Sequence, residues 1–156
     1  MFGSTSDVEP LRLLRPSLSE ISLLCTLYLR NCDPVYKLLH RPTLQRQVAA
    51  ASSNLDDIPG GKSMEALLFA IYYSAIISLT PEQCVQMFQA DKDSLLKRYR
   101  QGVEVALGKA DILNSTELRT LQALVIFLVS ISQQRATSFI IFKHSKPAGL
   151  RRCPNQ

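Results

Sequence analysis

The sequence contains no tryptophan, only two histidines, and four cysteines that are widely spaced and form no CxxC pair. A structural zinc site takes four ligands at short, recurring spacings, so none can be assembled locally from these residues. The thiols are therefore interpreted as core residues of a protein from a reducing compartment. The histidines are His40 and His144, and the cysteines are Cys25, Cys32, Cys84 and Cys153.

A secretory signal is also missing, because the first residues, MFGSTSDVEP, contain no basic segment followed by an apolar one. An intracellular protein is expected. The net charge of +5 is not spread evenly along the chain. Up to Ser132, 13 lysines and arginines balance 13 aspartates and glutamates, whereas five basic residues and no acid follow. The excess is thus weak support for a nucleic-acid-binding face on the folded part.

No apolar run reaches the roughly 20 residues that a bilayer crossing takes. The longest is SMEALLFAIYYSAIISL, residues 63–79, in which Glu65 is the one charge. Apolar side chains fall on every side of a helical projection of this run, which is typical of a helix surrounded by other helices. We expect residues 63–79 to form the central helix of one domain, since 156 residues with 46% hydrophobic content can build a real core.

Start signals predict the flanking helices. Ser17 and Glu20 form an S-x-x-E capping box before a helix expected to end near Asn31, and Thr80 with Gln83 repeats the signal. An amphipathic helix of about 18 residues follows, and its apolar positions recur at three- and four-residue spacings. These positions are Leu95, Leu96, Tyr99, Val103, Ala106, Leu107 and Ala110.

The segment NCDPVYKLLHRPTLQ is expected to hold two short helices that meet at a corner from His40 to Pro42. Asp33 and Pro34 suit a helix entry, with the carboxylate as the cap and the proline ring in the first turn. Asparagine, aspartate, proline and glycine residues then predict a loop over residues 52–61.

The last helix is predicted to be capped by Asn114 or Ser115 and to end near Val129. From Gln133 onward the helical pattern gives way to a short β-like patch, a turn signal and basic residues. No segment before residue 136 alternates convincingly with a period of two, so the predicted fold class is all-α.

The expected architecture is about six helices packed around the central helix of residues 63–79. A flexible arm over residues 1–16 precedes the helical domain, which is assigned to residues 17–131. Residues 132–156 are expected to be a disordered basic tail.

No catalytic, cofactor-binding or metal-binding residue is assigned. The segment from Gly60 to Ser63 resembles the end of a phosphate-binding loop, but Asp56 stands where the first glycine of that loop belongs. His40 beside Arg41 is interpreted as a packed or capping residue, because the sequence identifies no partner for a general base.

Two charge clusters also have structural interpretations. The acids are too few for a calcium loop and stand where helix caps belong. A basic cluster could contact phosphate, but a solvated helix face accounts for it and is preferred. The acids are Asp56, Asp57, Asp91 and Asp93, and the cluster is Lys97, Arg98 and Arg100.

The order and spacing of three stretches resemble the fungal-specific transcription factor domain, the middle homology region of zinc binuclear cluster (Zn2Cys6) regulators. The stretches are residues 27–45, 64–84 and 95–129, and the likeness covers roughly residues 20–129. The most specific part has the pattern D-P-x-x-K-x-L-H-x-P, at Asp33, Pro34, Lys37, Leu39, His40 and Pro42.

The resemblance implies an all-α regulatory domain of a gene-specific transcription factor in the nucleus, of a kind that controls metabolic or secondary-metabolite genes. DNA contact in that family comes from a separate six-cysteine cluster holding two zinc ions, which the four cysteines here do not match. We therefore expect a truncated, non-enzymatic fragment without cofactors or direct DNA binding. Its expected partner is a full-length regulator or a second copy, a small-molecule effector is compatible with the resemblance, and no membrane contact is expected.

Family members continue past a segment like LQALVIFLV into further helices. One hypothesis is that Val129 or Ser130 marks an exon end and that the following tail is translated intron or a shifted reading frame. A last helix cut off from its neighbours would expose apolar surface, and such surface drives association. The residues expected to be exposed are Leu121, Leu124, Val125 and Leu128.

Two other functions stay open at this point. One is a helical adaptor unrelated to transcription, which an absence of nuclear accumulation would favour. The other is a small helical biosynthetic enzyme using His40 and nearby acids, which an activity insensitive to His40→Ala would exclude.

Overall fold

The structure is a computed structural model that describes residues 8–53, 61–114 and 116–144. Over these ranges the chain forms eight helices and no strand, which confirms the all-α class with more helices than the six or so predicted. The helices are α1 (Val8–Leu14), α2 (Leu18–Asn31), α3 (Asp33–Tyr36), α4 (Arg41–Ser53), α5 (Gly61–Ile77), α6 (Pro81–Phe88), α7 (Lys92–Lys109) and α8 (Leu118–His144).

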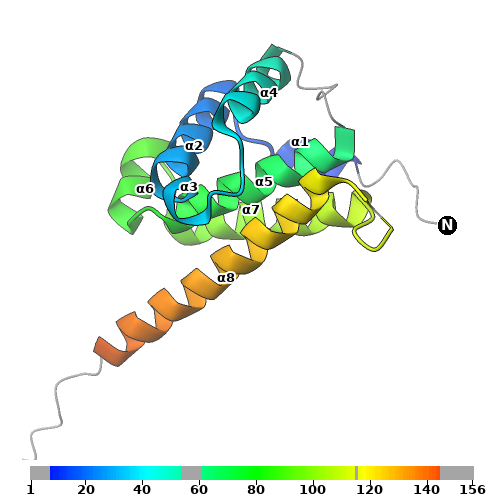
Figure 1. Ribbon diagram of the computed structural model, residues 1–156. Coiled ribbons are helices and arrows are strands. Elements are labelled where there is room, and N and C mark those ends of the chain that lie inside the picture. Colours follow the sequence, from blue (N-terminus) through cyan, green and yellow to red (C-terminus); the bar gives the residue numbers. More distant parts are fainter. Residues whose placement is uncertain (1–7, 54–60, 115, 145–156) are drawn as a thin grey trace, which may run out of the picture.

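Helix α5 lies at the centre and packs against α2, α7 and α8 (Figure 1). All its residues from Ala66 to Ile76 are buried, so the predicted central helix is confirmed. Burial on every side matches the sequence, in which no stretch of this helix offers a polar face to water. None of the helices in the described ranges has the length and apolarity that a membrane crossing requires.

The one acid of α5 is neutralised by a residue far away in the sequence. The guanidinium group of Arg15 donates to Glu65 Oε1 through its Nε atom at 3.0 Å and through a terminal nitrogen at 2.6 Å. Both side chains are less than one-fifth exposed. Because a buried carboxylate is destabilising without a counter-ion, this pair allows α5 to carry a charge at the edge of the core.

Residues 8–16 do not form the loose arm that the sequence analysis expected. They contain α1, whose Leu11 is almost completely buried and which packs against α7. Arg98 of α7 donates to the carbonyl oxygens of Leu14 and Arg15 at 3.0 and 2.7 Å. The prediction failed because these anchoring partners lie more than 80 residues away; residues 1–7 of the expected arm lie outside the described ranges.

Both predicted capping boxes are present. The Ser17 amide donates to Glu20 Oε2 at 2.7 Å, and the Glu20 amide donates back to the Ser17 hydroxyl. Thr80 and Gln83 make the same reciprocal pair at the start of α6. The predicted capping role of Asp91 is also confirmed at the start of α7, where the acid accepts hydrogen bonds that hold its pKa below the usual range.

The last helix differs from its prediction at both ends. It begins at Leu118, so Asn114 does not cap it and instead closes a turn by donating to the carbonyl oxygen of Asp111. The alternative cap, Ser115, lies outside the described residues. At the other end α8 continues past Val129 to His144. Its residues 130–144 contain no proline or glycine, and glutamine, arginine and alanine within them favour a helix. The remainder of the predicted tail, residues 145–156, lies outside the described ranges.

Helices α5 and α7 approach closely at Gly102. A Cβ atom placed on this glycine would overlap the aromatic ring of Phe69 on α5. The glycine therefore lets the two helix backbones come near each other, and the Phe69 ring fills the space that a larger residue would take. The Phe69 ring also meets Tyr72, and Tyr72 meets Tyr99, each at 5.6 Å between ring centroids.

We predict that Gly102→Ala lowers the free energy of unfolding by about 1 to 3 kcal/mol, because the added methyl group overpacks the contact with Phe69. Gly108→Ala is the matched control, since a Cβ atom there has no neighbour within 4 Å. On the same helix this control should be neutral or stabilising by up to about 1 kcal/mol. Urea unfolding of both variants checks the prediction, and equal effects at the two positions would contradict it.

Candidate interaction surface

The corner between α3 and α4 carries the D-P-x-x-K-x-L-H-x-P pattern. Asp33 does not cap α3, as the sequence analysis expected; Cys32 occupies the cap position without a side-chain hydrogen bond. The buried Asp33 carboxylate instead accepts from Arg41 Nε through its Oδ2 atom at 2.8 Å. Arg41 also donates to the carbonyl oxygen of Leu29 at 2.9 Å. The pattern therefore ties the start of α4 to α3 and to the end of α2.

His40 completes the corner immediately before α4, where its side chain and its carbonyl oxygen both contact the first turn of that helix. Its side chain is exposed, and its Nδ1 atom lies 2.7 Å from the hydroxyl oxygen of Thr43. Its carbonyl oxygen accepts from the Leu44 amide at the first turn of α4. A hydroxyl group does not orient or activate a histidine for general-base chemistry as a buried carboxylate does.

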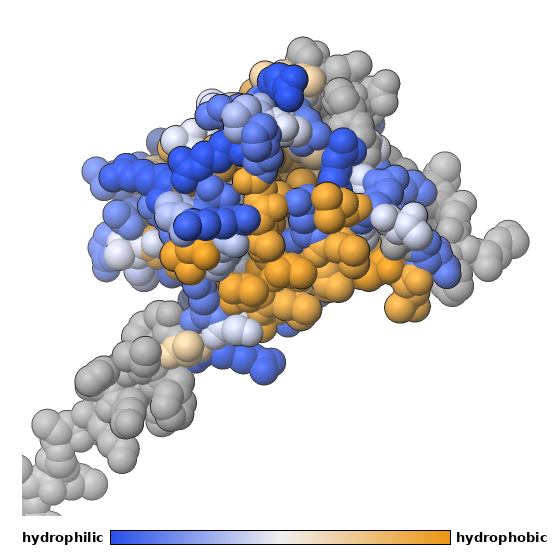
Figure 2. All heavy atoms as spheres, viewed as in Figure 1, coloured by the Kyte–Doolittle hydropathy of each residue, from blue (hydrophilic) through white to orange (hydrophobic). Residues whose placement is uncertain are grey.

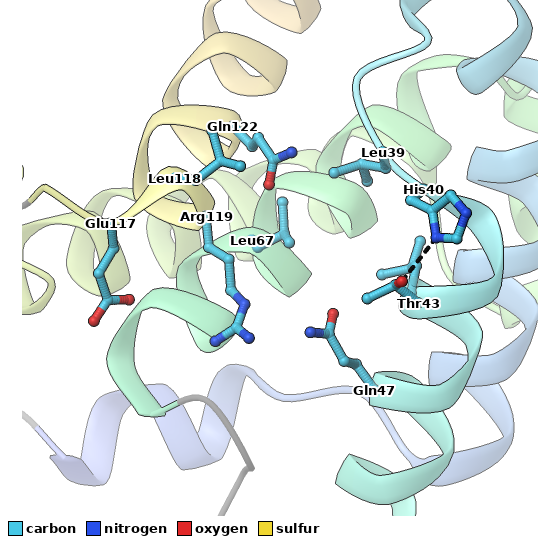
Figure 3. Close-up of a pocket in the computed structure, with 10 residues that line it drawn as sticks. Leu39, His40, Thr43, Gln47, Leu67, Glu117, Leu118, Arg119 and Gln122 are labelled. Atoms are coloured by element: carbon cyan, nitrogen blue, oxygen red, sulfur yellow. Dashed lines mark hydrogen bonds between the residues drawn. The ribbon is translucent and has the colours of Figure 1, made fainter.

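A groove of about 520 Å³ lies between α4, α5 and the first turns of α8 (Figure 3). Leu39, Leu67 and Leu118 give it an apolar lining. Gln47 of α4 and Arg119 of α8 point toward each other across it in Figure 3, which also shows Glu117 on the side far from His40.

One hydrogen bond holds the two walls of the groove in register. The side-chain amide of Gln122 on α8 donates to the carbonyl oxygen of Leu38 at 2.9 Å, across 84 residues of sequence. The corner that carries the D-P motif and the first turns of α8 are thus joined directly. Sequence analysis did not single out Gln47 or Arg119, because isolated polar residues on helices carry no motif; Gln122 belongs to the L-Q-A-L segment of the resemblance, which gave it no contact.

The thiols of the described cysteines are buried, as predicted. Cys25, Cys32 and Cys84 form no disulfide with one another, and burial raises the pKa of each. For Cys25 the pKa rises to about 12. Since the thiolate is the nucleophile, these residues are held in the unreactive form. Cys153 lies outside the described residues.

Described residues of the basic cluster make contacts within the chain. Arg98 holds α1, and Arg100 forms an exposed ion pair with Glu104 at 3.2 Å, so two of the three basic residues of the cluster make contacts within the chain, and Lys97 is exposed. Gly61 starts α5 with a positive φ of 61°, and Ser63 is buried. In the described ranges no three histidine, cysteine or acidic side chains gather as metal ligands. Asp56, Asp57 and Gly60 lie outside these ranges.

The clearest exposed feature is a row of apolar side chains on α8, which we call the α8 apolar face. It consists of Leu118, Leu121, Val125 and Leu128, which are between 41% and 69% exposed. Figure 2 shows apolar side chains gathered over this part of α8. Three of the four residues expected to be exposed belong to it, whereas Leu124 is partly buried against the core. A contiguous apolar row of this kind is a candidate site of association.

Comparison with curated proteins finds relatives among fungal transcription regulators. The C6 finger domain transcription factor adaR of Aspergillus niger is 38% identical over 130 residues, which is 82% of this chain and 17% of adaR. The Aurofusarin cluster transcription factor aurR2 of Gibberella zeae is 41% identical over 116 residues, 74% of this chain and 17% of aurR2. The transcriptional regulator nsrM of Aspergillus novofumigatus is 36% identical over 134 residues, 86% of this chain and 19% of nsrM.

The chain spans less than a fifth of the length of these three relatives. A matched stretch of 134 residues reaches at least residue 134 even if it starts at Met1, so the likeness to nsrM passes Val129. Together with the continuation of α8, this removes the break in pattern that motivated an exon end at Val129 or Ser130. No model of a known protein family matches the chain, and no solved structure matches it.

We predict that Arg41→Ala lowers the free energy of unfolding by about 2 kcal/mol, because it leaves the buried Asp33 carboxylate without its counter-ion. The loss is modest because the Arg41 side chain is half exposed and solvent partly screens its charge. Arg46→Ala is the control, because Arg46 is an exposed arginine on the same helix. Chemical unfolding should leave the control within about 0.5 kcal/mol of the unsubstituted chain; equal losses in both variants would argue against the pair.

Proposed function

The chain is homologous to one segment of the fungal C6 finger transcription factors, and we propose that it works as part of the regulatory region of such a factor. The observation that carries this proposal is the 36 to 41% identity to adaR, aurR2 and nsrM over 74 to 86% of this chain. The proposed role of the chain is therefore in transcription regulation, in the nucleus. The name of aurR2 ties that relative to the aurofusarin cluster, which supports control of a secondary-metabolite gene set.

The physical role that we propose is regulation through protein contact. The described helices form a packed body with an exposed apolar face on α8, and apolar faces of this kind suit helix-to-helix contact. Of the basic cluster Lys97, Arg98 and Arg100, the two arginines make contacts within the chain. DNA contact is therefore not assigned to α7.

An enzymatic role has less support. The relatives are named as transcription factors, the described thiols are held in the protonated form, and the His40 ring contacts a hydroxyl group. Neither the adaptor role outside transcription nor the small biosynthetic enzyme has an observation of its own that favours it.

A segment exchange tests the proposal. In adaR of Aspergillus niger, the matched segment would be replaced by the corresponding residues of this chain, and transcripts of genes that depend on adaR would be measured. We expect transcription well above that of adaR with the segment deleted. His40→Ala within the exchanged segment should leave this output unchanged, because the side chain is exposed and lies at the rim of the groove.

The control exchange carries Ile71→Asp, which places a charge in the centre of α5 where the native side chain is completely buried. It should behave like the deletion, because an unpaired buried charge unfolds the segment. An unsubstituted exchange that accumulates to the level of intact adaR, yet gives no more transcription than the deletion, would overturn the proposal.

A further inference from the structure

Arg119 is a partly buried arginine whose side chain lines the groove between α4, α5 and α8. In the part of the chain that the structure describes, no hydrogen bond, ion pair or ring contact joins this side chain to another residue. By contrast, a partner is present for each of Arg15, Arg41, Arg98 and Arg100. A guanidinium group that has lost part of its hydration without gaining a partner favours the binding of an anion.

The residues around Arg119 leave its positive charge uncompensated. The first turns of α4 and α8, which belong to the two walls of the groove, contain no acidic residue. Glu117 is the acid among the residues that line the groove, but it is exposed and stands just before α8. In the described ranges no ion pair joins Glu117 to Arg119. The groove is therefore complementary to a ligand that carries a negative charge.

A second hydrogen-bonding group faces Arg119 from the opposite wall. The partly buried side chain of Gln47 on α4 points toward Arg119 across the groove (Figure 3). A guanidinium group donates through two parallel N–H groups, and a side-chain amide adds a further donor. A carboxylate accepts from both groups and carries the single charge that one arginine balances. A phosphate ester carries nearly two charges at neutral pH, so it matches this arrangement less well.

Leucine side chains form the apolar part of the groove. They are Leu39, Leu44, Leu67 and Leu118. Leu67 belongs to the central helix α5 and is almost completely buried, whereas Leu118 is exposed on the wall formed by α8. A ligand with an apolar body beside its carboxylate would remove the surface of these leucines from water, and that burial is favourable.

The hydrogen bond from Gln122 to the carbonyl oxygen of Leu38 limits the length of the ligand. It joins α8 to the corner before α4, beside the lining residue Leu39, so the two walls are tied together at this level. A peptide chain laid along the groove would have to pass over this bridge, whereas a compact molecule fits beside it. The arrangement therefore favours a small organic acid over an extended protein segment.

We propose that the groove between α4, α5 and α8 binds a small carboxylic acid with an apolar body. The carboxylate accepts hydrogen bonds from Arg119 and Gln47, and the apolar body lies against the leucines of the groove. Binding of this kind requires no role in transcription, so it stands or falls separately from the function proposed above.

Titration of the full 156-residue chain with two matched probes is the first test. Octanoate and octanamide have the same apolar chain and nearly the same shape, but only octanoate is charged. NMR spectra of the leucine methyl groups should show shifts at Leu39, Leu67 and Leu118, and none at Leu96, which is buried on α7 away from the groove. We expect affinity in the millimolar range for a ligand of this size, with octanamide bound about tenfold more weakly.

Substitutions of Arg119 then test the source of the preference. Arg119→Met keeps an apolar stem but removes the charge, so octanoate and octanamide should bind equally. Arg46→Met is the matched control, because it removes the same charge from an exposed position on α4 that does not line the groove. This control should keep the preference for octanoate. Arg119→Glu should reverse it and favour octylamine, which is protonated at neutral pH. Circular dichroism of each variant should match that of the unsubstituted chain.

A third probe distinguishes a free acid from a protein segment. The capped heptapeptide Gly-Gly-Leu-Asp-Leu-Gly-Gly presents a carboxylate between two leucines, and it should bind more weakly than octanoate because its backbone has to cross the bridge. Tighter binding of the peptide would overturn the proposal in favour of a protein partner.

Four further outcomes would overturn the proposal. Unchanged spectra at millimolar octanoate would show that the groove does not bind such an acid. Equal affinity of the unsubstituted chain for octanoate and octanamide, or a preference that persists in Arg119→Met, would exclude recognition of the charge by Arg119. Shifts centred on Leu121 and Leu128 would place the probe on the α8 apolar face instead of in the groove.

Discussion

A helix that is apolar around its whole circumference cannot stand in water, and α5 is such a helix. Its burial requires neighbours on every side, and α2, α7 and α8 supply them. Helix α7 can approach α5 closely because Gly102 has no side chain, and the Phe69 ring occupies the space that a side chain would fill. The arrangement of the other helices is best understood as the covering of α5.

Much of this arrangement could be predicted from sequence because its signals are local. The capping boxes at Ser17 and Thr80 and the capping acid Asp91 each act within three residues. The long apolar run of α5 predicts a central helix from composition alone. Exposure of Leu121, Val125 and Leu128 was also predictable, because α8 has more apolar residues around it than a single packing face can bury.

What sequence analysis missed depends on contacts between distant residues. Nothing near Glu65 indicates that Arg15 neutralises it, and nothing near Leu11 indicates that α7 anchors α1. Asp33 shows how a correct local signal can mislead. An acid before a proline suits a helix cap, but Arg41 eight residues later offers the buried carboxylate a charged partner, which is the stronger interaction. The groove escaped prediction for the same reason, since its two walls come from opposite ends of the domain.

The anchoring of α1 has a consequence for the order of events during synthesis. The Arg15 side chain binds a residue 50 positions later, and the backbone around it binds Arg98, more than 80 positions later. During synthesis α1 leaves the ribosome before α5 and α7, so the groups that fix it emerge only later. Of the described helices α1 is therefore among the last to find its place, and until then it is accessible to chaperones and proteases.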